Sequence, residues 1–125
     1  MKIVWTNGCF DIIHSGHLAT LKKAKSFGDF LIVGIDSDES IKKLKGPERP
    51  INPENERAEV LASMNFIDNI IIFPEGAVKK YISILKPDVY VKGGDYTIET
   101  INQEERKVVE SYGGKIIFIP KIEGK

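Results

Sequence analysis

Apolar and amphipathic segments alternate along the whole chain. Short runs of consecutive apolar residues, rich in Ile and Val, predict strands at 2–6, 30–35, 69–73, 88–92 and 115–119. Between these runs, apolar positions recur three and four residues apart, which predicts helices at 15–28, 52–64, 77–85 and 100–114.

Three of the predicted helices carry residues that commonly stand at helix ends. Ser15 can cap the first helix and Gly28 can end it, while Asn52 can cap the second. Thr100 and Gln103 have the spacing of a capping box at the start of the last helix. These signals set the expected boundaries of the helices.

Strands that alternate with helices indicate parallel strands joined by right-handed crossovers. We therefore predict one α/β domain over residues 1–125, a Rossmann-like, doubly wound, five-stranded parallel sheet of order 3-2-1-4-5. Ligands of such sheets bind beyond the carboxyl ends of the strands at the switch point, here between the first and fourth strands.

The segment TNGCFDIIHSGH, residues 6–17, lies at this switch point and holds both histidines of the chain, His14 and His17. The helix that follows presents free backbone N–H groups and a partial positive charge, which favour an anion. Gly8 and Gly16 allow the backbone to approach a ligand closely or to adopt positive φ. We predict that the two imidazoles flank an anion such as a phosphate.

The same two histidines are compatible with two further roles. They could be a structural pair, with one ring capping the helix and the other packed. They could also bind zinc with Cys9 and Asp11, although zinc usually takes three or four well-spaced protein ligands. A dinucleotide-dependent oxidoreductase is disfavoured, because the loop lacks GxGxxG.

Composition narrows the expected partners. Lys and Arg together number 18, as do Asp and Glu, and the resulting zero net charge argues against nucleic-acid binding. No apolar run approaches the length of about 18 residues that a membrane span needs. The start of the chain lacks a signal peptide, and the single Cys9 allows no internal disulfide, so we expect a cytoplasmic protein.

Positive side chains gather after the second strand although the chain is neutral overall. The cluster consists of Lys42, Lys43, Lys45 and Arg49. We predict residues 43–51 as an active-site loop, with a solvated surface loop as the alternative.

Residues 91–96, VKGGDY, follow the fourth strand on the other side of the switch point. Lys92 can meet a phosphate and Asp95 can accept hydrogen bonds from sugar hydroxyls. A plain turn is the alternative, because Gly-Gly and Gly-Asp are common turn sequences.

Residues 14–17, His-Ser-Gly-His, match the HxGH signature of the nucleotidyltransferase superfamily, which includes the cytidylyltransferases. The longer string TNGCFDIIHSGH resembles the adenylyltransferase domain of ADP-heptose synthesis. Three further stretches share that resemblance, which covers nearly the whole chain: KKLKGPERPINPENERAEVL (42–61), FIDNIIIF (66–73) and VKGGDY (91–96).

The resemblance implies transfer of AMP from ATP to D-glycero-β-D-manno-heptose 1-phosphate, giving ADP-heptose and pyrophosphate. The sugar phosphate would attack the α-phosphorus in line, so catalysis would be positioning and charge stabilisation. Mg²⁺ is expected with ATP, without an all-protein metal site, and a homodimer is expected. The alternatives are a cytidylyltransferase for a polyol phosphate such as glycerol 3-phosphate, and a non-catalytic nucleotide-binding module.

Carried onto this sequence, the resemblance leads us to predict three groups of site residues. The catalytic residues are His14, His17 and Lys45. Nucleotide binding is predicted for Thr6, Asn7, Gly8, Cys9, Phe10, Gly16, Lys92 and Gly93, and acceptor binding for Asp11, Lys42, Arg49, Arg57 and Asp95. As alternatives, Asp11 could brace its loop through backbone N–H groups, and Arg57 could pair with Glu54 or Glu56 on the surface.

The sequence departs from the family pattern after the last predicted strand. Members typically carry a Ser-Thr-Thr motif there, whose hydroxyl and N–H groups hold the triphosphate. Residues 120–125, PKIEGK, stand where the motif would begin, so either the chain is truncated or this version lacks the motif. We expect weaker nucleotide binding and turnover, with Lys121 as a candidate substitute for an arginine of related cytidylyltransferases.

Overall fold

The computed structural model describes residues 1–74, 76–94 and 96–120. Along the chain the strands are β1 (Ile3–Gly8), β2 (Phe30–Asp36), β3 (Asn69–Phe73), β4 (Val89–Gly93) and β5 (Lys115–Ile119). The helices are α1 (Ser15–Lys25), α2 (Asp38–Lys45), α3 (Glu54–Ala62), α4 (Val78–Leu85) and α5 (Gln103–Ser111). Each strand and helix predicted from the sequence is present, and α2 is an addition.

The five strands form one parallel sheet in the order β3-β2-β1-β4-β5, which confirms the predicted order 3-2-1-4-5. The central strand β1 pairs with β2 on one side and with β4 on the other. The carboxyl ends of β1 and β4 therefore lie side by side where the chain changes direction across the sheet.

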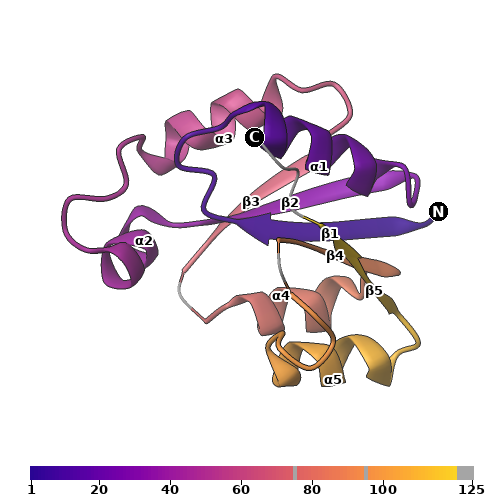
Figure 1. The fold of residues 1–125 in the computed structure, drawn as a ribbon. Coiled ribbons are helices and arrows are strands. Elements are labelled where there is room, and N and C mark those ends of the chain that lie inside the picture. Colours follow the sequence, from indigo (N-terminus) through magenta and orange to yellow (C-terminus); the bar gives the residue numbers. More distant parts are fainter. Residues whose placement is uncertain (75, 95, 121–125) are drawn as a thin grey trace.

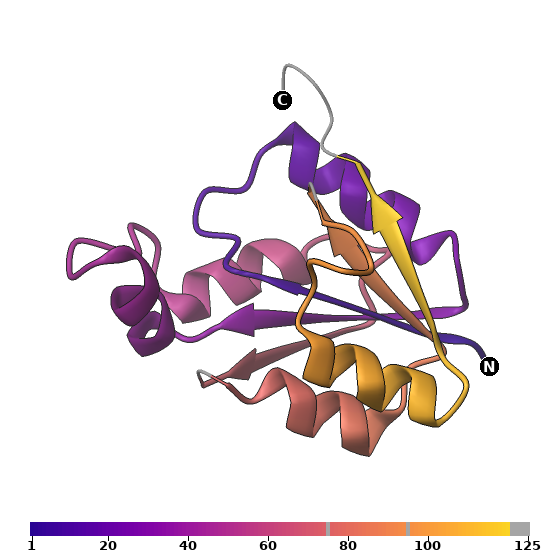
Figure 2. The same ribbon diagram turned by 60° about the horizontal axis from the view of Figure 1, so that its bottom comes forward.

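Helices cover both faces of the sheet (Figure 1). α1 and α3 lie on one face, where Val4, Leu21 and Leu61 belong to one buried cluster. α4 and α5 lie side by side on the other face, where Trp5, Ile82 and Val109 belong to a second cluster (Figure 2). Because neighbouring strand residues point to opposite faces and both faces are buried, the strands appear in the sequence as unbroken apolar runs.

The ends of α1 differ from the prediction. Its N-cap is His14 rather than Ser15, and its C-cap is Ser26, two residues before the predicted end at Gly28. A Cβ at Gly28 would lie 2.7 Å from Val4 Cγ2 and 2.8 Å from the Lys2 carbonyl oxygen. Gly28 therefore lets the connection from α1 pass close to β1, and it does not end the helix.

The predicted caps of α3 and α5 are also wrong. Pro53 is the N-cap of α3 and makes no side-chain cap hydrogen bond, because the Asn52 amide donates to the Asp11 carbonyl oxygen instead. Asn102 caps α5 by accepting from the Glu105 N–H, which replaces the predicted cap at Thr100.

Part of the predicted loop 43–51 belongs to α2. Ser37 caps α2 by accepting from the Ser40 N–H, and the last turn carries Lys42, Lys43 and Lys45. Positive side chains there complement the negative end of the helix dipole. The loop proper follows Lys45 and contains a cis peptide bond between Arg49 and Pro50.

Within the described residues, no helix has the length and apolar character needed to cross a membrane.

Candidate active site

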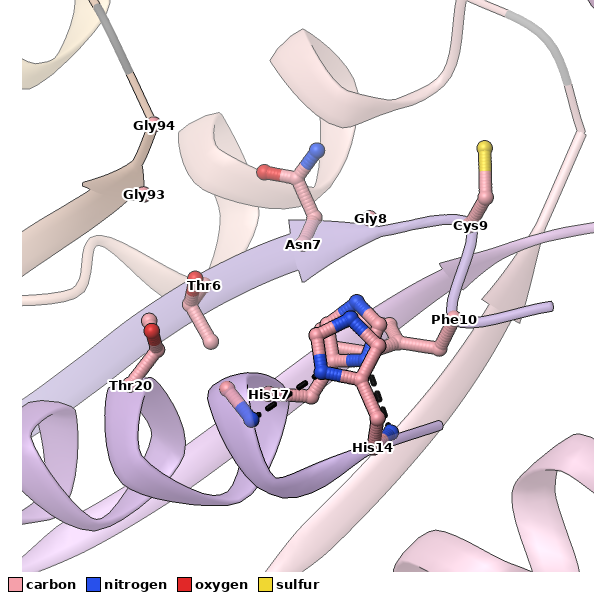
Figure 3. Close-up of a pocket in the computed structure, with 11 residues that line it drawn as sticks. Thr6, Asn7, Gly8, Cys9, Phe10, His14, His17, Thr20, Gly93 and Gly94 are labelled. Carbon is pink, nitrogen blue, oxygen red and sulfur yellow. Dashed lines mark hydrogen bonds between the residues drawn. The ribbon is translucent and has the colours of Figure 1, made fainter. Parts of the chain in front are cut away.

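Two adjoining cavities open at the carboxyl ends of the central strands. The first, here called the histidine cavity, has a volume of about 300 Å³ and is lined by Thr6, Asn7, Gly8, Cys9, Phe10, His14, Gly16, His17, Thr20, Gly93 and Gly94 (Figure 3). The second, the cationic cavity, has a volume of about 580 Å³ and is lined by Asn7, Gly8, Cys9, Phe10, Asp11, Ile12, His17, Asp36, Leu44, Lys45, Arg49, Lys92, Gly93 and Tyr96. The segment from Asn7 to Phe10 lines both, so the two cavities meet along the end of β1.

The two histidines are tied into the first turn of α1 through their Nδ1 atoms. The Gly16 N–H donates to His14 Nδ1 at 3.0 Å, and the His14 N–H donates to His17 Nδ1 at 3.2 Å. Figure 3 shows the two rings beside each other, with a separation of 4.1 Å between their centroids. The capping role considered from the sequence is therefore present for His14, in addition to any role toward a ligand.

These hydrogen bonds determine which nitrogen of each neutral ring carries the proton. Nδ1 accepts a hydrogen bond in both rings, so the hydrogen of the neutral form lies on Nε2. Burial and the neighbouring His14 hold the pKa of His17 below its usual value of 6.5. Near pH 7, His17 is thus a neutral ring with an Nε2–H donor for an anion in the cavity.

Phe10 packs beside the His17 ring, and Gly8 lies close to Phe10. The edge of the Phe10 ring faces His17 at a centroid separation of 5.4 Å, and Phe10 itself has a positive φ of 50°. A Cβ at Gly8 would lie 3.1 Å from Phe10 Cε2, closer than most such contacts. A side chain at Gly8 would therefore crowd the Phe10 ring, and neither Gly8 nor Gly16 is among the glycines with positive φ.

Hydrogen bonds across the switch point orient Asn7. Its Oδ1 accepts from Trp5 Nε1 at 3.0 Å and lies 3.0 Å from the Tyr90 hydroxyl, whose single hydrogen also has the Glu105 carboxylate within reach at 2.7 Å. Thr6 Oγ1 donates to the Val91 carbonyl oxygen at 2.9 Å and joins the ends of β1 and β4. Because the amide oxygen of Asn7 is engaged on the protein side, its nitrogen is the end suited to donate to a ligand.

The cationic cavity combines Lys45, Arg49 and Lys92 with two carboxylates. Arg49 Nε lies 3.0 Å from Asp11 Oδ2. Lys92 Nζ lies over the ring of Tyr96, 4.8 Å from its centroid. Lys45 and Lys92 come from opposite sides of β1, so positive charge reaches the cavity from two elements.

Asp11 braces the loop that follows α2. Its carboxylate accepts from the backbone N–H groups of Ile51 and Asn52 at 2.9–3.1 Å. Burial raises the pKa of Asp11, but these N–H groups and the Arg49 guanidinium outweigh it and hold the pKa below its usual value. The bracing alternative is therefore present in the structure, and contact of Asp11 with the acceptor stays a prediction.

Arg57 is buried, with 1% of its surface exposed. Its guanidinium donates to the carbonyl oxygens of Asn52, Cys9 and Asp36 at 2.7–2.9 Å and pairs with the Asp38 carboxylate at 2.8 Å. These contacts replace the considered surface pairs with Glu54 or Glu56. They favour a bracing role over the predicted direct binding of acceptor.

The cavities bring together most of the residues predicted from the sequence. All eight residues predicted for nucleotide binding line one or both cavities, as do the predicted catalytic residues, Asp11 and Arg49. Lys42 is exposed and lines neither cavity, and Arg57 lies behind the site. Asp95 and Lys121 lie outside the described residues.

Sequence reasoning missed several cavity residues. They are Thr20 and Asp36, together with Ile12 and Leu44, whereas Gly94 and Tyr96 lie in the predicted segment 91–96. Thr20 follows His17 by three positions, so both were recognisable as neighbours on one face of a helix. Asp36 ends β2, and a polar residue at the carboxyl end of a central strand is itself a site signal.

Among the described residues, no group of three or more His, Cys, Asp or Glu side chains could hold a metal ion. Cys9, one of the two extra ligands considered for zinc, has its thiol 3.4 Å from Asp36 Oδ2. Figure 3 shows the Cys9 sulfur turned away from the imidazole rings. The other, Asp11, is occupied by backbone N–H groups, so neither completes a zinc site with the histidines.

The site combines imidazole donors at a helix N-terminus with an adjoining cavity lined by cations. This combination suits an enzyme that binds a nucleotide and a second phosphorylated substrate. The class expected from the sequence, a nucleotidyltransferase, is such an enzyme. Comparison with known proteins agrees. The chain belongs to the cytidylyltransferase-like family, which it matches over residues 5–122.

Two curated relatives are named "Bifunctional protein HldE". The one from Geotalea uraniireducens is 48% identical to this chain, and the one from Geobacter metallireducens is 49% identical, each over 99% of the chain. The chain spans 25% of the length of each of these relatives.

A solved structure described as a lipopolysaccharide core biosynthesis protein from Thermoplasma volcanium shares the fold, with a TM-score of 0.79 and 27% identity. It covers 100% of this chain, and the match includes 99% of that protein. Pantoate-beta-alanine ligase from Francisella tularensis, at 20% identity and a TM-score of 0.65, shares the fold alone.

Proposed function

We propose that this chain transfers AMP from MgATP to D-glycero-β-D-manno-heptose 1-phosphate, giving ADP-heptose and pyrophosphate. The observation that carries the proposal is the histidine pair at the N-terminus of α1, adjoining a second cavity that contains Lys45 and Lys92. The sugar is inferred from the resemblance of residues 6–17, 42–61 and 91–96 to adenylyltransferases of ADP-heptose synthesis. Similarity to a lipopolysaccharide core biosynthesis protein supports the same inference.

In this mechanism the triphosphate lies over the start of α1. The Nε2–H groups of His14 and His17, at the positive end of the α1 dipole, donate to phosphate oxygens and stabilise charge that develops there. The acceptor phosphate lies in the cationic cavity near Lys45 and Lys92. Because both cavities meet at the end of β1, the α-phosphorus and the attacking oxygen can be brought together there.

The transfer needs no protein nucleophile. A phosphate oxygen of the sugar 1-phosphate forms a bond to the α-phosphorus, and the bond from that phosphorus to the oxygen bridging to the β-phosphate breaks. Pyrophosphate leaves with the electron pair, and no proton has to move.

Mg²⁺ enters this proposal as part of the substrate MgATP. Phosphate oxygens and water would hold the ion there. Its chemistry there is to neutralise the charge of the triphosphate. A cytoplasmic location and a homodimer belong to the same proposal, and sedimentation velocity tests the dimer.

Pyrophosphate release tests the proposed reaction directly. ATP and CTP are each supplied with Mg²⁺ and with heptose 1-phosphate, mannose 1-phosphate or glycerol 3-phosphate. Release with ATP and heptose 1-phosphate is the expected result, and the variant His14→Ala serves as the control for the site.

Two different results would select the alternative functions. Release with CTP and glycerol 3-phosphate would replace the proposal with a polyol-phosphate cytidylyltransferase. Binding of ATP without release from any pair would identify a non-catalytic nucleotide-binding module.

A further inference from the structure

Asp36 is a carboxylate in the cationic cavity to which the proposed reaction assigns no role. It ends β2, where it pairs with Phe73 of β3. Arg57 donates to its backbone carbonyl oxygen at 2.8 Å, so the main chain of Asp36 is fixed from behind. Its side chain lines the cavity together with Lys45 and Lys92.

The Asp36 carboxylate keeps most of its capacity to accept hydrogen bonds. Within the described part of the chain, its side-chain hydrogen bond comes from the Cys9 thiol, at 3.4 Å to Oδ2. A thiol is a weak donor, whereas an ionised carboxylate can accept about four hydrogen bonds. Burial, followed by the Asp36 charge, raises the pKa of Cys9, so the thiol stays protonated and remains a donor.

Positive groups around Asp36 are available to a phosphate, but Asp36 itself is not. Lys92 and Lys45 lie near enough to stabilise its negative charge, although burial has the larger effect and raises the pKa of Asp36. A phosphate in this cavity would pair with the lysines and be repelled by the carboxylate. The favourable neighbours for Asp36 are neutral O–H donors.

The volume of the cavity suits a ligand of this composition. About 580 Å³ lies within the usual range of small-molecule sites, roughly 300–1,000 Å³. A sugar phosphate carries an anionic end for Lys45 and Lys92 and several hydroxyl groups for a carboxylate. We propose that Asp36 determines specificity for the acceptor by accepting hydrogen bonds from its sugar hydroxyls.

This inference rests on the proposed function and adds the residue by which the second cavity would select the hydroxyl groups of the acceptor. The test measures pyrophosphate release at saturating MgATP with heptose 1-phosphate and with its monodeoxy analogues. The proteins are the unaltered chain, Asp36→Ala, Asp36→Asn and the control Glu39→Gln. Glu39 is exposed on α2 and lines neither cavity, so its variant removes one negative charge away from the site.

For the unaltered chain, we expect loss of the recognised hydroxyl to lower kcat/KM by about 10- to 100-fold. Asp36→Ala should lower kcat/KM for heptose 1-phosphate by about the same factor. With that deoxy analogue, kcat/KM of Asp36→Ala should fall little further, because the hydrogen bond is already absent. Asp36→Asn keeps an acceptor oxygen and the side-chain shape, and should lose less than Asp36→Ala. The KM for ATP and the activity of Glu39→Gln should not change.

The assignment would be overturned if every deoxy analogue lowered kcat/KM, relative to heptose 1-phosphate, by the same factor in the unaltered chain and in both Asp36 variants. So would an effect of Asp36→Asn on the KM for ATP alone. No pyrophosphate release by the unaltered chain with any sugar phosphate would instead overturn the proposed function, and the role of Asp36 with it.

Discussion

At the scale of the residue, each histidine of the site uses its two nitrogens for different purposes. Nδ1 accepts a hydrogen bond from a backbone N–H group at the start of α1. This leaves the Nε2–H group to donate to a ligand. A substitution that removes the whole ring therefore removes a helix contact and the proposed phosphate donor together. Asparagine separates the two, because its amide oxygen can accept at the position of Nδ1 while nothing replaces Nε2.

We predict that His17→Ala and His17→Asn both lower kcat by at least about tenfold, since each loses a donor that stabilises charge in the transition state. His17→Asn should unfold at nearly the temperature of the unaltered chain. Steady-state kinetics and thermal unfolding check the two statements. Unchanged turnover in both variants would remove His17 from the catalytic residues.

At the scale of the element, α1 depends on the protonation state of its first turn. A proton on His17 Nδ1 would abolish the hydrogen bond from the His14 N–H. Burial lowers the pKa of His17 in the folded chain, so the unfolded chain takes up this proton at a higher pH. The contribution of His17 to stability is therefore complete above about pH 6.5 and is lost as the pH falls through the folded pKa.

We predict that the melting temperature of the unaltered chain falls more steeply than that of His17→Asn below pH 6.5. Asp11 has a lowered pKa and affects stability only at more acidic pH, while Asp36 is present in both proteins. Thermal unfolding between pH 7.5 and pH 5 measures the difference. Parallel curves would show that protonation of His17 does not affect the stability of the fold.

α2 ends at Lys45, which lines the cationic cavity. We predict that Lys45→Ala raises the KM for the phosphorylated acceptor by about tenfold, because it removes a charged partner of the phosphate. Lys107→Ala, an exposed change on α5 with the same loss of charge, is the matched control. Unchanged KM and kcat for Lys45→Ala would indicate that this segment is a solvated surface.

The elements differ in how far the sequence could predict them. The strands were predictable because β1, β2 and β4 are buried on both faces and stay apolar without interruption. α2 was not, because its buried residues are Ser40 and Ile41, which leaves too few apolar positions to show a helical period.

The caps and parts of the site depended on contacts that are remote in sequence. Asn52 has the residue type and local position of a cap, but its amide donates to the carbonyl oxygen of Asp11 in another loop. The HxGH segment could be placed at the switch point from the sequence alone. The bracing role of Arg57 could not, because its partners come from three other segments.

At the scale of the whole molecule, Arg57 links the parts that frame the site. One guanidinium joins the loop after β1, the end of β2, the start of α2 and the residue before Pro53. A buried cation with several hydrogen bonds leaves unsatisfied partners when it is removed, and the partners lie in different elements. Arg57 therefore affects the stability of the fold as well as the shape of the cavities.

We predict that Arg57→Ala lowers the free energy of unfolding by about 3–5 kcal/mol, since it leaves Asp38 and three carbonyl oxygens without their partner. Lys79→Ala removes an exposed pair with Glu104 and should lower it by less than about 1 kcal/mol. Urea unfolding of both variants makes the comparison. Similar small losses in the two would contradict the bracing role.

The position of β1 between β2 and β4 also has a consequence for biosynthesis. The ribosome makes the imidazoles and the start of α1 before Gly93 and Gly94, which lie on the opposite side of the histidine cavity and emerge about 75 residues later. A nascent chain therefore displays the histidines without an enclosed place for a nucleotide until those residues have emerged. Binding competence therefore requires the docking of β4 and does not come with the signature segment alone.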